Sequence, residues 1–105
     1  MGNIKVISLS GRLDSYTIPA SRKLLDEALE SQHPEIVVNM QAVNFVDSTA
    51  LSALVQALKR SRNLNGNLRL CCLQQPVRMI FELTRLDKIF EIFSSEREAV
   101  QAFVD

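Results

Sequence analysis

Hydrophobic residues recur along this chain with two different periods, and each change of period predicts a new element of secondary structure. Residues 4–9 read Ile-Lys-Val-Ile-Ser-Leu, in which hydrophobic side chains fall mostly at every second position, as in a strand that Gly11 then ends. From about Thr17 the period becomes helical, with Pro19 in the first turn, where its missing N–H costs no hydrogen bond. The side chains that can share the buried face of this helix are Ile18, Leu25, Ala28 and Leu29.

The middle of the chain predicts a buried strand and a long helix. Gln32-His33-Pro34 ends the first helix, and the unbroken apolar run Ile36-Val37-Val38 predicts a strand covered on both faces. We expect residues 41–46 to form a connection. Residues 48–64 then predict a long helix, which Asn65-Gly66 ends as a C-terminal cap. The apolar stripe of this helix consists of Leu51, Leu54, Val55 and Leu58.

The last part of the chain predicts four shorter elements. Residues 68–73 are expected to form a strand, Pro76 to open a helix, and residues 88–93 to form a last short strand. Ser95-Glu96-Arg97-Glu98 fits a capping box, in which the glutamate at its end reaches back to the backbone of the serine. The residues expected to face the core are Val77, Ile80, Phe81 and Thr84 from the first helix and Ala99, Val100 and Phe103 from the second.

This order of strands and helices predicts an α/β fold. Strands separated by helices form mostly parallel sheets with right-handed crossovers. We expect one domain over residues 1–105, with four to five strands and about four helices, because a chain of this length supports a single core. No segment is long and apolar enough to cross a bilayer, and residues 1–6 lack the features of a signal peptide. The expected location is therefore the cytoplasm.

The balance of charge restricts the possible partners. Lys and Arg together number 12, as do Asp and Glu, so the formal net charge is zero. Nucleic acids and anionic membranes are usually bound by a basic excess, which this chain does not have. The densest basic group, Lys59, Arg60 and Arg62, is interpreted as the solvated end of a helix.

Few residues suit catalysis or metal binding. Cys71 and Cys72 are neighbours that would point to opposite faces of a strand, which argues against a disulfide between them. No further Cys or His lies at metal-ligand spacing. We therefore interpret Cys71 and Cys72 as reduced thiols, one of which is packed inside the protein. The only histidine, His33, lies in a polar loop, and the chain has no glycine-rich phosphate loop. We expect no enzymatic activity, no metal and no cofactor.

The segment Asn44-Phe45-Val46-Asp47-Ser48-Thr49-Ala50-Leu51 is the most informative one. It places three small polar residues where a buried segment meets a helix N-terminus, with its free N–H groups and positive dipole end. A phosphate on Ser48 would be tolerated there, and its roughly two negative charges could disrupt an interface suited to a neutral serine. The structural alternative is that these polar residues only cap the helix.

At this segment the sequence resembles STAS domains, and among them the bacterial anti-sigma-factor antagonists. The resemblance covers nearly the whole chain, including Gly11-Arg12-Leu13-Asp14, the strand at residues 36–38, the segment 45–51 and the break at Gly66. The family often has Gly-Leu-Gly after the two hydroxyl residues, whereas this chain has Ala50-Leu51-Ser52. Alanine is a good helix former and should keep the turn.

The resemblance implies a mechanism of regulation. In that family the serine after the aspartate is phosphorylated by a partner kinase that is also the anti-sigma factor. It implies that Ser48 is the acceptor, that Asp47 supports kinase recognition, and that Asp14 is the second acidic position at the same edge. The unphosphorylated protein would bind the ATP-binding kinase, phosphorylation would release it, and a phosphoserine phosphatase would restore binding. The protein is expected to be a monomer or weak dimer.

We expect the partner to bind a flat surface around the N-terminal end of the long helix, with Phe45 beneath it as support. Polar residues further along the helix, Gln56, Lys59 and Arg60, would extend the contact. The residues expected to contact the partner are Asp14, Ser15, Tyr16, Asp47, Ser48, Thr49 and Ser52.

Two other functions remain open. A receiver-like domain phosphorylated on Asp47 would need a divalent cation held by several acidic oxygens. The chain supplies Asp14 but no acidic pair after the first strand, and Lys88 opens its strand and so does not lie at a late strand end. The second alternative is a passive STAS scaffold in another signalling pathway, with the same fold and an unmodified Ser48.

Overall fold

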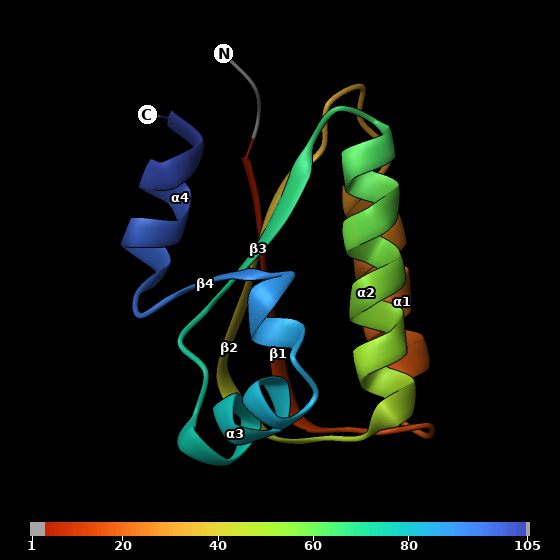
Figure 1. Ribbon diagram of the computed structural model, residues 1–105. Helices are drawn as coiled ribbons and strands as arrows, with labels where there is room; N and C mark the ends of the chain where they lie inside the picture. Colours follow the sequence, from red (N-terminus) through yellow and green to blue (C-terminus); the bar gives the residue numbers. More distant parts are fainter. Residues whose placement is uncertain (1–3, 105) are drawn as a thin grey trace.

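A single parallel sheet forms the centre of the molecule. The computed structural model describes residues 4–104 and has four strands in the order β1-β2-β3-β4. Each strand pairs in parallel with the next (Figure 1), which confirms the predicted α/β fold. The strands are β1 (Ile4–Leu13), β2 (Glu35–Val46), β3 (Asn67–Cys71) and β4 (Glu91–Phe93).

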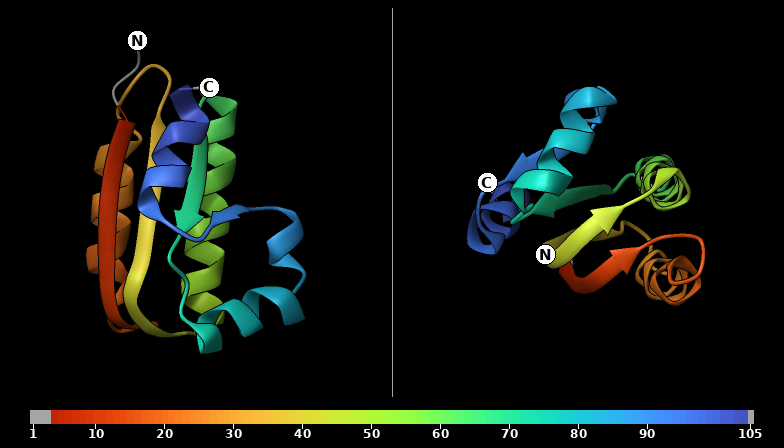
Figure 2. Two further views of the ribbon diagram at one scale, coloured as in Figure 1. Left: turned by 90° about the vertical axis from the view of Figure 1, so that its left-hand side faces the viewer. Right: turned by 90° about the horizontal axis from the view of Figure 1, so that it is seen from below.

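The helices cover the two faces of this sheet unequally. Because sequential parallel strands are joined by right-handed crossovers, their connecting helices all fall on one face. The helix that follows the last strand is free to cover the other face, and Figure 2 shows it there. The connecting helices are α1 (Ile18–Ala28), α2 (Ser48–Asn63), α3 (Gln75–Leu83) and the short 3-10 helix η1 (Leu86–Lys88), and the last helix is α4 (Glu96–Val104).

The hydrophobic core follows this division into layers. Ile36 and Val38 belong to the large cluster under the connecting helices, whereas Val37 packs with Ala99 of α4 on the other face. All three strand residues are fully buried, which confirms that this strand is covered on both faces. The predicted buried face of α1 is also confirmed, since Ile18, Leu25, Ala28 and Leu29 are all buried.

The first two strands are longer than predicted. Residues 41–46 continue β2 instead of forming a connection, and β1 runs through Gly11 to Leu13. The pairing of the two strands shifts register between Ser8 and Ser10 and again between Gly11 and Arg12. Such bulges break the alternation of buried and exposed side chains, so the period of two is lost from the sequence. Gly11 has φ of +76°, a conformation that favours glycine at a bulge.

The structure confirms that Asn65-Gly66 caps the C-terminal end of α2, and the two residues have different roles in the cap. Asn65 takes the left-handed conformation, and its N–H donates to the Arg62 carbonyl. The N–H of Gly66 donates to the Ser61 carbonyl at 2.8 Å, which completes a Schellman motif. Gly66 is needed for space, because a Cβ there would lie 1.9 Å from the Pro34 carbonyl oxygen.

The C-terminal elements are confirmed with two corrections. The predicted strand 88–93 is shorter, because Leu86–Lys88 forms a 3-10 turn before Glu91–Phe93 enters the sheet. Thr84 is exposed at the end of α3, where its hydroxyl donates to the Ile80 carbonyl instead of facing the core. One half of the predicted capping box of α4 is present, since the Glu98 N–H donates to Ser95 Oγ at 3.1 Å, while the Glu98 carboxylate accepts from the hydroxyls of Ser94 at 2.6 Å and Ser95 at 3.2 Å.

The two cysteines lie on the same side of the sheet, contrary to the expectation of opposite faces. Cys72 follows the end of β3 with φ of +64°, so its side chain turns toward the cluster under α4 that also holds Cys71. Both are free thiols, and Cys71 is fully buried, as expected of one of the pair. Burial, together with a hydrogen bond to Cys72, raises the pKa of Cys71 to about 12.

Candidate functional site

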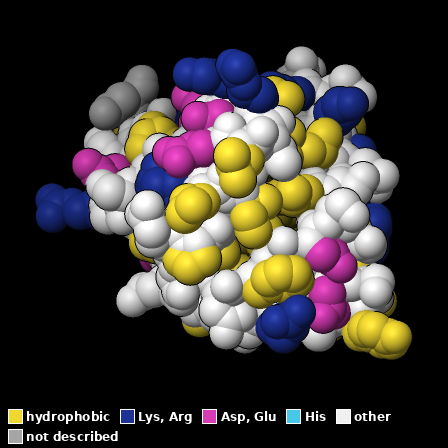
Figure 3. Space-filling view, turned by 60° about the horizontal axis from the view of Figure 1, so that its bottom comes forward, with side chains coloured by type: hydrophobic (Ala, Val, Ile, Leu, Met, Phe, Trp, Pro, Cys, Tyr) yellow, Lys and Arg dark blue, Asp and Glu magenta, His cyan; other side chains and the backbone are white. Residues whose placement is uncertain are grey.

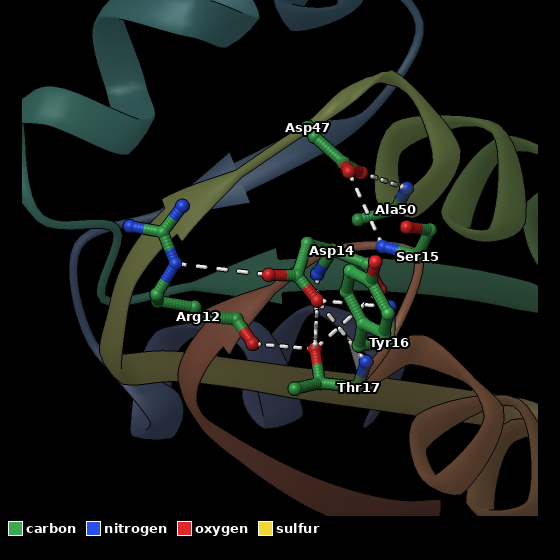
Figure 4. Close-up of polar contacts among 7 residues, drawn as sticks. All are labelled: Arg12, Asp14, Ser15, Tyr16, Thr17, Asp47 and Ala50. Carbon is green, nitrogen blue, oxygen red and sulfur yellow. Dashed lines mark hydrogen bonds and ion pairs between the residues drawn. The ribbon is translucent and has the colours of Figure 1, made fainter.

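The site lies where β1 and β2 end side by side. The two strands are paired up to Leu13 and Val46, so Asp14 and Asp47 follow neighbouring carboxyl ends of the sheet. The N–H of Asp47 donates to the Leu13 carbonyl at 3.0 Å and joins the two exit loops. Segments more than thirty residues apart in sequence therefore meet at one edge of the molecule (Figure 4).

Asp47 holds this junction together through both carboxylate oxygens. Oδ1 accepts a hydrogen bond from the Ala50 N–H at 2.9 Å, which makes Asp47 the N-cap of α2. Oδ2 accepts a hydrogen bond from the Ser15 N–H at 3.2 Å, in the loop after β1. One side chain thus starts the helix and ties it to the neighbouring loop (Figure 4).

Asp14 organises its own loop. Its Oδ1 accepts hydrogen bonds from the N–H groups of Tyr16 at 3.0 Å and Thr17 at 3.1 Å, and from the Thr17 hydroxyl at 3.2 Å. Desolvation acts to raise the pKa of Asp14, but hydrogen bonds from Thr17 and Tyr16, with the charge of Arg12, outweigh it and lower the pKa. The carboxylate therefore stays ionised and holds the turn.

Two contacts at this site were not predicted from the sequence. The Thr17 hydroxyl accepts from the Asp14 N–H at 2.9 Å, and its one hydrogen is shared between the Arg12 carbonyl at 2.6 Å and Asp14 Oδ1 at 3.2 Å, so it does not cap α1. The spacing Asp14-Ser15-Tyr16-Thr17 is the one signal of this turn, because aspartate and threonine often bond to nearby backbone. The guanidinium of Arg12 also lies 4.1 Å from the centre of the Phe45 ring, which is half-buried at this edge.

The hydroxyl residues of α2 are placed differently from Asp47. Because Asp47 fills the N-cap, Ser48 is the first residue of the helix and is exposed. Within residues 4–104, the Ser48 hydroxyl has no hydrogen-bond partner. Thr49 is half-buried, and Ser52, one turn further on, is exposed beside Ser48. Capping of the helix therefore explains the aspartate but not the serine.

The predicted flanking residues also border this edge. Ser15 is exposed, and the Tyr16 side chain projects into solvent with 91% of its surface exposed. Further along α2, Gln56 and Arg60 turn toward α1, where they contact Arg22 and Asp26. The polar residues that would extend the contact are thus partly engaged within the molecule, whereas Lys59 is exposed.

The described part of the chain offers no site for a metal ion and no membrane-spanning helix. Among residues 4–104, no three side chains of His, Cys, Asp or Glu gather as metal ligands would. In the same range, every helix is too short or too polar to span a bilayer. This edge of the molecule carries an exposed serine beside two carboxylates at the N-terminus of a helix.

Comparison with known proteins identifies the fold family. The family model described as STAS domain matches residues 1–99. The chain belongs to the STAS domain family. This assignment confirms the resemblance found in the sequence, and the relatives of this STAS domain support the expectation that it is a regulatory protein and not an enzyme.

Relatives of this STAS domain are named as antagonists of anti-sigma factors. The anti-sigma F factor antagonist of Paenibacillus polymyxa is 29% identical over 98 residues, which span 92% of this chain and 84% of the relative. The anti-sigma-B factor antagonist of Listeria monocytogenes is 30% identical over 92 residues, covering 88% and 81%. The crystal structure of an anti-sigma factor antagonist from Mycobacterium paratuberculosis has a TM-score of 0.87 at 26% identity, covering 97% of this chain and 86% of that one.

Proposed function

We propose that this STAS domain is a cytoplasmic anti-sigma-factor antagonist controlled by phosphorylation of Ser48. Its unphosphorylated form binds an anti-sigma factor that is also a serine kinase and supplies its own ATP. Phosphorylation of Ser48 releases this partner, and a phosphoserine phosphatase restores binding. The observation that carries the proposal is the exposed Ser48 hydroxyl, which is left free because Asp47 caps the helix.

The position of Ser48 suits a charge switch that leaves the fold unchanged. A phosphate adds roughly two negative charges and three acceptor oxygens. The N-terminus of α2 tolerates such an anion, because the helix dipole favours negative charge there. Asp14 and Asp47 already place two carboxylates at this edge. The charge of the phosphate weakens binding of the partner, because desolvating that charge in an interface costs several kcal/mol.

The same geometry indicates which surface of this protein would bind the partner. Ser48 and Ser52 lie one turn apart on the exposed side of α2, with Thr49 half-buried between them. The loop after β1 borders them through Ser15, whose N–H donates to Asp47. The surface therefore consists of Asp14, Ser15, Tyr16, Asp47, Ser48, Thr49 and Ser52.

Titration calorimetry with the purified kinase tests this proposal. Ser48→Ala should bind as tightly as the unmodified protein, whereas Ser48→Asp should bind at least about ten-fold more weakly, because it places a charge in the interface. The control is Ser31→Asp, which adds the same charge at an exposed serine in the loop between α1 and β2. Equal affinities for the two Ser48 variants would indicate a passive scaffold.

A further inference from the structure

The outer side of β1, which we call the β1 edge, is an unpaired strand edge. β1 has ten residues and pairs with β2, and among residues 4–104 no strand lies along its other side. Near its end, the Arg12 carbonyl accepts a hydrogen bond from the Thr17 hydroxyl at 2.6 Å. An unpaired edge presents a row of backbone N–H and C=O groups to which another strand can bond.

Helix α1 and β1 enclose a hollow along this edge. Figure 2 shows α1 directly behind β1, at the outer edge of the sheet. An open hollow of about 260 Å³ lies between them, and its apolar lining consists of Leu9 and Leu13 of β1 with Ala20 and Leu24 of α1. The other described residues that line it are serines and a threonine, so none of them is charged. The hollow therefore suits an uncharged, apolar side chain.

The β1 edge is apolar on the opposite face of the sheet as well. Val6 pairs with Val37 of β2, which packs under α4, so both side chains point to that face. The Val6 side chain is nevertheless 44% exposed. Because successive side chains of a strand point to opposite faces, a strand added to β1 would place one set of side chains at the hollow and the other beside Val6.

A free strand edge specifies its occupant more closely than an apolar patch does. Figure 3 shows hydrophobic side chains gathered over the end of the molecule where α3 lies. Such a patch offers contact area alone, because a helix forms hydrogen bonds within its own backbone. The β1 edge offers backbone donors and acceptors in series, which an extended chain can bond while its side chains enter pockets at alternate positions.

A second copy of this chain does not fit the β1 edge. Two-fold pairing of β1 with itself would join two sheets, each with α1 directly behind its edge strand. Adjacent strands lie about 4.8 Å apart, whereas packed helices need about 8–10 Å between their axes, so the two α1 helices would overlap. We propose that the β1 edge binds an extended, apolar segment of a partner protein as an additional strand, independently of phosphorylation at Ser48.

NMR titration of the intact protein tests the proposal. The probe is a short synthetic peptide in which valine and threonine alternate around a central leucine, with a lysine at each end for solubility. Its matched control has the same side chains but a methyl group on each backbone nitrogen, which removes the donors that pair with β1. The first peptide should shift amide signals of β1 and α1 and bind at least about ten-fold more tightly than the control. It should also slow hydrogen exchange at alternate amides of β1, those that point away from β2.

Two variants separate the hollow from exposed leucines in general. Leu24→Asn should weaken binding of the first peptide at least about ten-fold, because it replaces an apolar contact in the hollow by an amide without a partner. Leu83→Asn makes the same change at an exposed leucine of α3 and should leave binding unchanged. Absence of binding, equal binding of both peptides, shifts located elsewhere, or protection of β1 by self-association without peptide would each overturn the proposal.

Discussion

At the scale of single residues, Asp47 has two structural roles and belongs to the proposed signalling site. Its two oxygens accept hydrogen bonds from Ala50 in α2 and Ser15 in the neighbouring loop. Removing the side chain would therefore affect stability as well as recognition, and the two effects need separate variants.

We expect Asp47→Ala to lower the free energy of unfolding by about 1–2 kcal/mol, the usual effect of losing an N-cap. Asp47→Asn should lose less than Asp47→Ala, because its remaining side-chain oxygen can still cap α2 while its NH2 group cannot accept the hydrogen bond from the Ser15 N–H. Urea unfolding measures both. Equal losses in the two variants would show that the contact with Ser15, and not the cap, stabilises this junction.

Titration of the Asp14 carboxyl group provides a second test at the scale of single residues. Its pKa lies below the ordinary value of 3.8, because hydrogen bonds from Thr17 and Tyr16 together outweigh desolvation. A group whose pKa is lower in the folded state stabilises the protein above its unfolded pKa, and this contribution is lost as the pH falls through the folded pKa.

NMR titration of the Asp14 carboxyl should accordingly give a pKa below 3.8 in the native protein. In Thr17→Val, which lacks the hydroxyl donor but keeps the shape of the side chain, this pKa should rise. An unchanged pKa in the variant would mean that the backbone N–H groups alone hold the carboxylate.

Individual site residues differed in how far the sequence could predict them. Asp47 and Ser48 belong to one contiguous segment at a helix start, so local chemistry was enough to single out the segment and its cap. The choice of Ser48 as the acceptor came from the family resemblance. The contact between Arg12 and Phe45 joins residues of different strands and depends on their register. Bulges set that register, and their positions are not visible in the pattern of hydrophobic residues.

At the scale of elements, the turn after α2 is closed by contact between two loops. Asn65 supplies the left-handed residue of the cap, while Gly66 packs against the backbone of Pro34. The N–H of Asn67 then donates to the Pro34 carbonyl at 2.9 Å and starts β3 beside β2. This glycine is required for close approach of two backbones and not for its own φ angle.

Gly66→Ala should therefore destabilise the protein by at least about 3 kcal/mol, because the new methyl group would overlap backbone atoms that cannot move aside. Gly11→Ala is the matched control. It places a methyl group in open space but in a left-handed conformation, which costs about 1 kcal/mol. Thermal or urea unfolding of the two variants in parallel checks this order, and a larger loss at Gly11 would contradict it.

Elements with a regular period were predictable, and those with bulges or tight turns were not. The stripe of α2 and the buried run in β2 follow from spacing alone. The second half of β2 lacks regular alternation, because Gln41 and Ala42 are both exposed next to a register shift. The left-handed residue Cys72 likewise turns its side chain to the face that already holds Cys71.

At the scale of the whole molecule, the order of strands explains where the site lies. Sequential parallel strands place the connecting helices on one face and leave α4 for the other (Figure 2). The carboxyl ends of β1 and β2 therefore open at one edge, which α4 does not cover (Figure 1). The fold class could be predicted because it depends on this order of elements, whereas the contacts at the edge depend on exact strand ends.

The central claim, that Ser48 is the phosphorylated residue of a switch, is tested most directly by phosphosite mapping. Purified protein and its Ser48→Ala variant are incubated with ATP and a kinase-active lysate of the native host, and the peptides are analysed by mass spectrometry. We predict acid-stable phosphate on Ser48 of the unmodified protein and none on the variant. Absence of phosphate from every residue, or an acid-labile phosphate on Asp47, would contradict the proposed switch.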